Sequence, residues 1–172
     1  IGAGAMSSAF AVPCVDNKNE VTVVGTHLEN DLIENIKINN HTHPSLQTQL
    51  PKEIKFERLE KLQKILEEDL DIIVCGVSSI GIEWFTKQIS KNYRKEIPII
   101  LLTKGLSIVD SELITLSDKI RILLKKEGYS DINISAIKGP CLAAGLANKM
   151  RTGTVIANPD IKETEKLKKI IS

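Results

Sequence analysis

Two glycines near the start of the sequence have a spacing that suits phosphate binding. Gly2 and Gly4 match the first two glycines of a G-x-G-x-x-G turn, and Ser7 takes the place of the third. The first glycine permits a tight turn, the second lets the backbone approach a pyrophosphate, and the free N–H groups of the following helix attract the anion. The segment therefore predicts a dinucleotide-binding turn.

A lysine and a glycine follow two apolar runs further along the chain. Lys104 comes soon after the run Pro98–Leu102, and Gly139 comes after the run Ile132–Ile137. Because ligands of open α/β sheets bind at the carboxyl ends of strands, both residues would face a ligand. The Lys104 ammonium can attract a phosphate or polarise a carbonyl oxygen as charge develops on it. The alternative is a solvated surface lysine.

The elements that must position these residues are strands alternating with helices. Continuous apolar runs are typical of parallel strands that are covered on both faces. Strands interleaved with helical patterns predict an α/β fold with a doubly wound, mainly parallel sheet of the Rossmann type. The predicted strands are Val21–Gly25, Asp71–Val77, Pro98–Leu102, Ile132–Ile137 and Thr154–Ala157, the predicted helices are Phe56–Leu66, Ser79–Asn92, Ser111–Lys126 and Ile161–Ile171, and Asn39–Pro51 is predicted as a loop.

Composition favours one soluble globular domain. The 172 residues are 42% hydrophobic, with 23 basic and 22 acidic side chains. No clustered basic face indicates nucleic-acid binding. No apolar run approaches the about 20 residues of a membrane span, and no secretory leader is visible.

Cysteines and histidines indicate no metal site. Cys14, Cys75 and Cys141 are far apart and odd in number, which favours reduced thiols in the cytoplasm. His41 and His43 lack a third ligand, so we expect them to be exposed to solvent. A nucleophilic role for Cys141 would need a histidine partner, and none is evident near it.

Two features depart from the simple dinucleotide-binding pattern. Pro13 falls inside the helix that follows the glycine turn and should kink or shorten it. The strand Val21–Gly25 continues into Thr26 and His27, without an acidic residue to hold a ribose 2′-hydroxyl and without an arginine for a 2′-phosphate. The choice between NAD and NADP therefore stays open.

Several segments, in order, resemble the N-terminal NAD-binding domain of the NAD(P)-dependent glycerol-3-phosphate dehydrogenase family. The Thr-Lys-Gly-Leu signature of that family is intact, and a Gly-Pro-x-x-Ala signature follows some thirty residues later. The resemblance covers nearly the whole chain. Its segments are Gly2–Ala9, Ile38–Pro51, Val74–Ser79, Thr103–Leu106, Lys138–Ala143 and Thr152–Ala157.

The resemblance implies an enzyme that interconverts sn-glycerol 3-phosphate and dihydroxyacetone phosphate by hydride transfer, with NAD or NADP as cofactor. It implies Lys104 as a catalytic residue that also contacts substrate and cofactor, and Gly139 and Cys141 as substrate-binding residues. The remaining cofactor-binding residues that it implies are Gly2, Gly4, Ala5, Met6, Thr26, Ser78 and Ala143.

Four positions differ from the family pattern. Cys141 replaces a serine, so a hydroxyl donor becomes a weak thiol donor, and Ser78 stands where proline is usual. Lys138 replaces a small residue, and Gly145 stands where glutamate is common.

The resemblance also bears on domain organisation. Residues 1–172 would form the dinucleotide-binding domain, with only the last residue of its first strand, Ile1, present. The helical substrate domain of the family, which carries the principal catalytic lysine and could form a homodimer, would lie outside this chain. We therefore expect these residues alone to be inactive.

Two alternatives stay open. One is another two-domain dehydrogenase of the same superfamily, such as a ketopantoate or hydroxyacid reductase, whose substrate would be a carboxylate. The other is a nucleotide-binding module without catalysis, which the replaced serine at Cys141 and the lost third glycine would suit.

Overall fold

The computed structural model of the chain describes residues 1–94 and 96–171. The strands are β1 (Thr22–Val24), β2 (Thr42–His43), β3 (Thr48–Gln49), β4 (Lys55–Glu57), β5 (Ile73–Cys75), β6 (Ile99–Leu101), β7 (Leu106–Val109), β8 (Glu112–Thr115), β9 (Ile134–Lys138) and β10 (Val155–Ala157). The helices are α1 (Ala5–Asp16), α2 (Asn30–Ile38), α3 (Leu62–Leu66), α4 (Ile82–Ile89), α5 (Leu116–Lys126), α6 (Ala143–Ala147) and α7 (Ile161–Ile171), with 3-10 turns at Leu59–Lys61 and Ser79–Gly81.

The main sheet is largely parallel. Its strand order is β10-β9-β6-β5, in which β5, β6 and β9 run parallel and β10 runs antiparallel to β9. A second, smaller sheet pairs β1 with β4 in parallel. Two short hairpins, β2–β3 and β7–β8, complete the strands. This arrangement confirms the predicted α/β class with mainly parallel strands.

The first two residues join the two sheets. The N-terminal ammonium of Ile1 donates to the Val74 carbonyl oxygen at 2.7 Å, and the Gly76 N–H donates to the Ile1 carbonyl oxygen at 2.9 Å. On the other side, the Gly2 N–H donates to the Val24 carbonyl oxygen at 2.8 Å. The glycine turn therefore starts between the carboxyl ends of β1 and β5.

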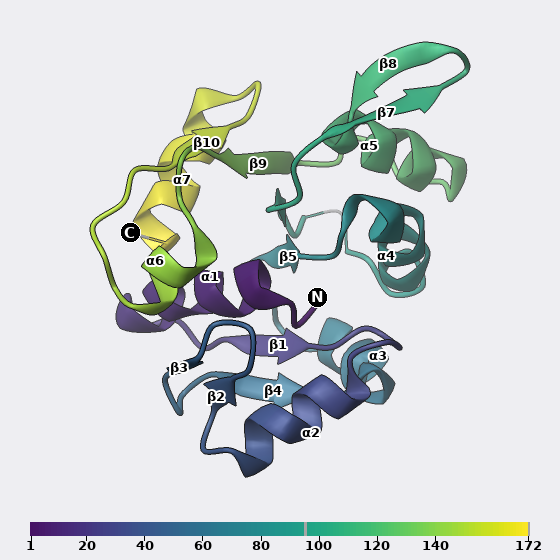
Figure 1. Cartoon of the computed structure of the whole chain (residues 1–172). Coiled ribbons are helices and arrows are strands. Elements are labelled where there is room, and N and C mark those ends of the chain that lie inside the picture. Colours follow the sequence, from purple (N-terminus) through teal and green to yellow (C-terminus); the bar gives the residue numbers. More distant parts are fainter. Residues whose placement is uncertain (95, 172) are drawn as a thin grey trace.

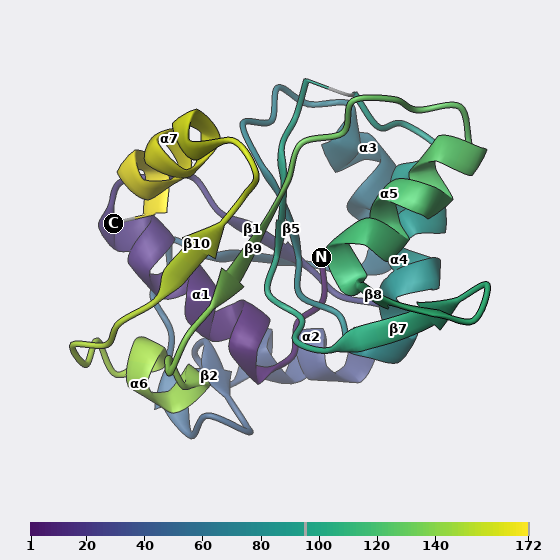
Figure 2. The same cartoon turned by 90° about the horizontal axis from the view of Figure 1, so that it is seen from above.

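Helices cover both faces of the main sheet (Figures 1 and 2). Along β6, Ile99 and Leu101 pack in the core cluster that α3, α4 and α5 cover. Ile100 and the next residue, Leu102, pack on the other face, against α1 and α7. Burial on both faces explains why this strand is continuously apolar instead of alternating.

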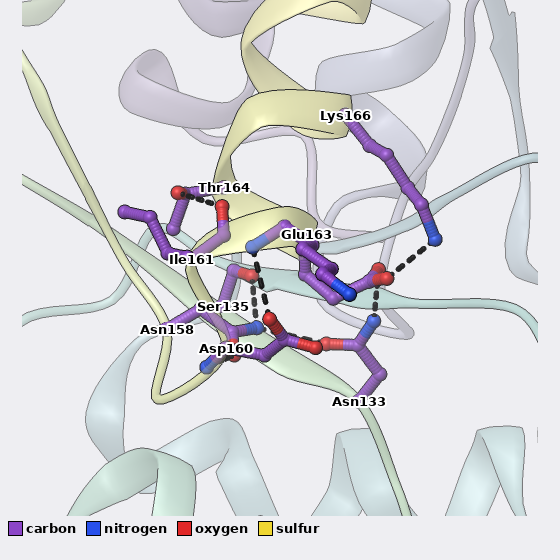
Figure 3. Close-up of polar contacts among 9 residues, drawn as sticks. Asn133, Ser135, Asn158, Asp160, Ile161, Glu163, Thr164 and Lys166 are labelled. Carbon is purple, nitrogen blue, oxygen red and sulfur yellow. Dashed lines mark hydrogen bonds and ion pairs between the residues drawn. The ribbon is translucent and has the colours of Figure 1, made fainter.

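An asparagine network fixes α7 to the sheet (Figure 3). Asn158 Nδ2 donates to Asn133 Oδ1 at 2.8 Å and to Ser135 Oγ at 2.7 Å. Asn158 Oδ1 accepts from the Asp160 N–H at 2.8 Å, and Asn133 Nδ2 donates to Glu163 Oε2 at 2.5 Å. These bonds hold the turn between β10 and α7 against β9.

Two predicted helices begin later than the sequence pattern indicates. The segment predicted as a helix from Phe56 starts as strand β4, because Phe56 pairs with Val23 of β1 and is buried. The helix predicted from Ser111 starts only at Leu116, since β8 pairs with β7 before it. Thr115 caps that helix by accepting from the Asp118 N–H at 3.1 Å.

Two smaller expectations also need correction. The predicted loop at residues 39–51 contains the hairpin β2–β3. Helix α1 is not shortened by Pro13 and continues to Asp16. Across residues 1–94 and 96–171, no helix combines the length and apolar character needed to cross a membrane.

Candidate functional site

The glycine turn packs against the turn that follows β5. Gly2 has a φ of +100°, which favours glycine, and a Cβ atom on it would lie 2.9 Å from the Gly76 carbonyl carbon. Gly4 then stands at the N-cap of α1, and no side chain caps this helix start. The backbone N–H groups of the first turn are therefore left to bind an anion.

A chain of hydrogen bonds links this turn to the ends of β6 and β9. The Thr103 hydroxyl donates to the Val77 carbonyl oxygen at 2.5 Å. Lys104 Nζ donates to the Gly139 carbonyl oxygen at 3.2 Å, and Lys138 Nζ donates to the Thr103 carbonyl oxygen at 2.7 Å. The glycine turn, Lys104 and Gly139 thus lie along one edge of the fold, at the carboxyl ends of neighbouring strands.

Two ammonium groups stand close together at this edge. Lys104 is exposed, and Lys138 is partly buried. Partial burial, together with the nearby Lys104 ammonium, lowers the pKa of Lys138 below the ordinary value of 10.5. Within residues 1–94 and 96–171, no carboxylate forms an ion pair with either lysine. The edge therefore presents uncompensated positive charge that suits a phosphate or another small anion.

The family follows from the sequence match. A family model described as the N-terminus of NAD-dependent glycerol-3-phosphate dehydrogenase matches residues 1–164. The chain belongs to this family.

Curated relatives of this chain are named as glycerol-3-phosphate dehydrogenases. The chain is 33% identical over 170 residues to the NADP(+)-dependent glycerol-3-phosphate dehydrogenase of Archaeoglobus fulgidus, with 99% of the chain and 49% of the relative covered. It is 29% identical over 173 aligned positions to the glycerol-3-phosphate dehydrogenase [NAD(P)+] of Mesoplasma florum, with 100% and 49% covered. The chain thus spans about half the length of the curated relatives it matches.

Solved structures agree on the fold of this glycerol-3-phosphate dehydrogenase family member. A glycerol-3-phosphate dehydrogenase from Plasmodium falciparum matches with a TM-score of 0.81 at 20% identity, covering 99% of this chain and 48% of that chain. One from Coxiella burnetii matches with a TM-score of 0.80 at 16% identity, covering 99% and 49%. At such identities the likeness shows the fold alone.

The cofactor-binding residues implied for a glycerol-3-phosphate dehydrogenase lie at the start of α1, after β1 and β5, and at the start of α6. Ala5 and Met6 form the first turn of α1, and both are half-buried. Thr26 follows β1 after a single residue, and exposed Ser78 precedes the 3-10 turn after β5. Ala143 begins α6 and packs on the core cluster beneath α1.

Cys141 is placed differently from Lys104. Its side chain is 3% exposed, and Sγ lies 3.7 Å from Thr154 Oγ1. It lines a cavity of about 810 Å³ that is bounded by α1, α6, β10 and α7. Within the described part of the chain, Cys141 and Lys104 share no hydrogen bond. The enclosed thiol therefore faces this cavity, whereas the exposed Lys104 ammonium reaches the edge at the carboxyl ends of the strands.

The structure reveals an acidic residue beside the glycine turn. Glu29 Oε2 accepts hydrogen bonds from the Ala3 N–H at 3.0 Å and from the Thr26 N–H at 2.8 Å. The sequence shows no acid directly after the strand, but Glu29 lies three residues beyond Thr26 and folds back. Its position just before α2, 25 residues after Gly4, is the signal that could have identified it.

The expectation that both histidines are exposed was wrong. His43 is 1% exposed, and its Nε2 lies 3.1 Å from the Ala3 carbonyl oxygen, which also accepts from Ser8 Oγ at 2.9 Å. His41 is half-buried and packs edge-on against the Phe56 ring. In residues 1–94 and 96–171, no group of three or more His, Cys, Asp or Glu side chains could hold a metal ion.

Proposed function

We propose that this chain is the cofactor-binding portion of an NAD(P)-dependent glycerol-3-phosphate dehydrogenase, which interconverts sn-glycerol 3-phosphate and dihydroxyacetone phosphate. The main support is the shared edge at which the glycine turn, Lys104 and Gly139 meet. The names of the relatives that match the chain support the same activity.

The residues at this edge fit a dinucleotide. Gly2 forms a turn that a Cβ atom would obstruct, and the start of α1 after Gly4 carries no side-chain cap. These features would hold the pyrophosphate, with Ala5 and Met6 beside it. A bound nicotinamide supplies or accepts the hydride. The protein contributes position and electrostatics.

Lys104 is suited to stabilise developing charge on the substrate. Its ammonium has three donors, of which one is directed at Gly139. The exposed side chain leaves the others available for the carbonyl oxygen of dihydroxyacetone phosphate, where negative charge builds up as hydride arrives. Lys138 adds positive potential next to it, which favours a phosphorylated substrate over a neutral one.

The remaining parts of the proposal concern the whole protein. A helical domain would supply the principal catalytic lysine and further phosphate contacts, and a homodimer could form through it. We place the protein in the cytoplasm, which its unpaired cysteines support. The substrate is a small molecule, and the near-neutral charge of +1 gives no basis for nucleic-acid binding.

The test is a substrate and cofactor assay of the full-length protein. Dihydroxyacetone phosphate should be reduced with NADH or NADPH, whereas ketopantoate and pyruvate should not. Lys104→Ala should lower kcat/KM by about a hundredfold or more. Residues 1–172 alone should show no turnover. An unchanged kcat/KM in Lys104→Ala would remove this residue from the site, and preference for a carboxylate substrate would replace the proposed activity.

A further inference from the structure

We infer that Glu29 binds the 2′-hydroxyl of the adenosine ribose and thereby selects NAD over NADP. The inference rests on the proposed function, because it assigns the cofactor preference of the same site.

The position of Glu29 is the first argument. Its carboxylate bridges Ala3, in the glycine turn, and Thr26, after β1. In a Rossmann fold the adenosine ribose lies between these two segments, and an acidic residue about 20 residues after the glycine turn holds its 2′-hydroxyl. Glu29 meets this description in space, although it follows the strand only after Thr26, His27 and Leu28.

The unused oxygen of the carboxylate is the second argument. Both backbone N–H groups donate to Oε2, and no described residue donates to Oε1. Oε1 lies 3.9 Å from the place that a Cβ atom on Gly4 would occupy, so it borders the bare backbone of the turn. An ionised carboxylate only accepts hydrogen bonds. A ribose hydroxyl can donate to it, and an ionised phosphate cannot.

The surrounding charges are the third argument. Among residues 1–94 and 96–171, Glu29 takes part in no ion pair. Two cations that lie against α2 are already paired, since Arg58 pairs with Glu34 and Lys37 pairs with Glu57. A 2′-phosphate placed beside Glu29 would meet a half-buried carboxylate of like charge, which disfavours NADP.

Glu29 also has a structural role, and the variants must separate the two. Glu29→Gln keeps an oxygen that can accept from Ala3 and Thr26 but removes the charge. Glu34→Gln is the matched control, because it makes the same charge change on α2 at a side chain that is directed at Arg58.

The experiment measures binding of ADP-ribose and of its 2′-phosphorylated form to the full-length protein by titration calorimetry. Wild-type protein and Glu34→Gln should bind ADP-ribose at least tenfold more tightly than the 2′-phosphate. Glu29→Gln should reduce that ratio at least tenfold while its melting temperature stays near the wild-type value. Equal or tighter binding of the 2′-phosphate by the wild type would overturn the inference, whether or not the variant folds, and so would an unchanged ratio in a folded Glu29→Gln.

Dihydroxyacetone phosphate reduction by the same preparation separates this inference from the proposed function. Turnover without discrimination at the 2′-position would leave the activity standing and remove the role of Glu29. Discrimination without turnover would keep the role of Glu29 and remove the activity. A preference for NAD would also set this protein apart from the Archaeoglobus fulgidus relative, which is named as NADP(+)-dependent.

Discussion

Ser7 and Gly76 pack so closely that a Cβ atom on Gly76 would lie 2.2 Å from Ser7 Oγ. Ser7 stands where the third glycine of the phosphate-binding turn is usual. The close approach of α1 to the end of β5 is therefore made possible by a glycine on the opposite segment. In the usual motif the missing side chain is that of the third glycine, on the helix. Here the missing side chain is that of Gly76, which follows β5.

The first prediction is that Gly76→Ala is destabilising and that Ser7→Gly restores stability. The added methyl group pushes the Ser7 side chain and the Ile1 carbonyl oxygen away from residue 76. Such overpacking costs about 1–3 kcal/mol of unfolding free energy. Urea denaturation of the two single variants and the double variant gives the coupling free energy between residues 7 and 76. Strictly additive effects would show that the two residues do not compete for this space.

The second prediction concerns Lys138. Lys138→Ser should raise KM for dihydroxyacetone phosphate roughly fivefold, which corresponds to about 1 kcal/mol for one charge interaction in a hydrated site. The dependence of KM on salt should weaken at the same time, because one cation fewer attracts the phosphate.

The pH dependence of KM gives a sharper test of the same residue. Because the pKa of Lys138 is lower than that of an ordinary lysine, its ammonium loses its proton at a lower pH as the pH rises, and KM of the wild type should rise with that loss. Lys138→Arg keeps its charge and should show a flatter profile. Identical profiles would mean that Lys138 does not act on the substrate.

The third prediction is a loss of stability at alkaline pH. Burial raises the pKa of Cys75 from 9.0 to about 12 and that of Tyr93 from 10.0 to about 12. Between the ordinary and the raised pKa, the unfolded chain has released the proton and the folded chain keeps it. Stability is therefore complete below about pH 9 and falls as the pH rises towards 12. For each of the two groups, the unfolding free energy drops by up to about 1.4 kcal/mol for every rise of one in pH across that interval.

The measurement is urea denaturation of the full-length protein at several values between pH 8 and pH 11. Cys75→Ser carries a hydroxyl that does not ionise, so its stability should decline less steeply than that of the wild type. Parallel curves for the two proteins would rule out Cys75 as a source of the decline.

The fourth prediction addresses the attachment of α7. Asn158→Ala removes the donor to Ser135, whose side chain is 0% exposed, and leaves that hydroxyl buried without this partner. The loss should cost about 1–3 kcal/mol of unfolding free energy, measured by thermal or urea denaturation. Thr164→Ala removes only a hydroxyl that donates to the Ile161 carbonyl oxygen within α7, so it serves as the control and should change stability by less than about 0.5 kcal/mol.

The main strands were predictable because burial on both faces makes their local sequence continuously apolar. In β6, Ile99 and Ile100 face opposite helical layers, so the run is apolar at every position. The arrangement of Gly2, Lys104 and Gly139 at one edge followed from the rule that parallel strands end on the same side.

Pairing between distant segments explains the errors. Phe56 has helical spacing to the leucines that follow, yet its pairing with Val23 draws it into a strand. Sequence periodicity contains no information on that partner. His43 was misjudged and Glu29 was overlooked for the same reason, since each acquires its place only by reaching Ala3 across the fold.

The reversed direction of β10 has a consequence for how this protein can diversify. Because β10 runs opposite to β9, the stretch from Gly139 to Thr154 both leaves and re-enters the sheet at the ligand-facing border. Insertions or exchanges there would reshape the entrance while the inner packing of β6 and β9 stays untouched. Related proteins can therefore acquire a different ligand selectivity through sequence changes in this segment, which contains α6.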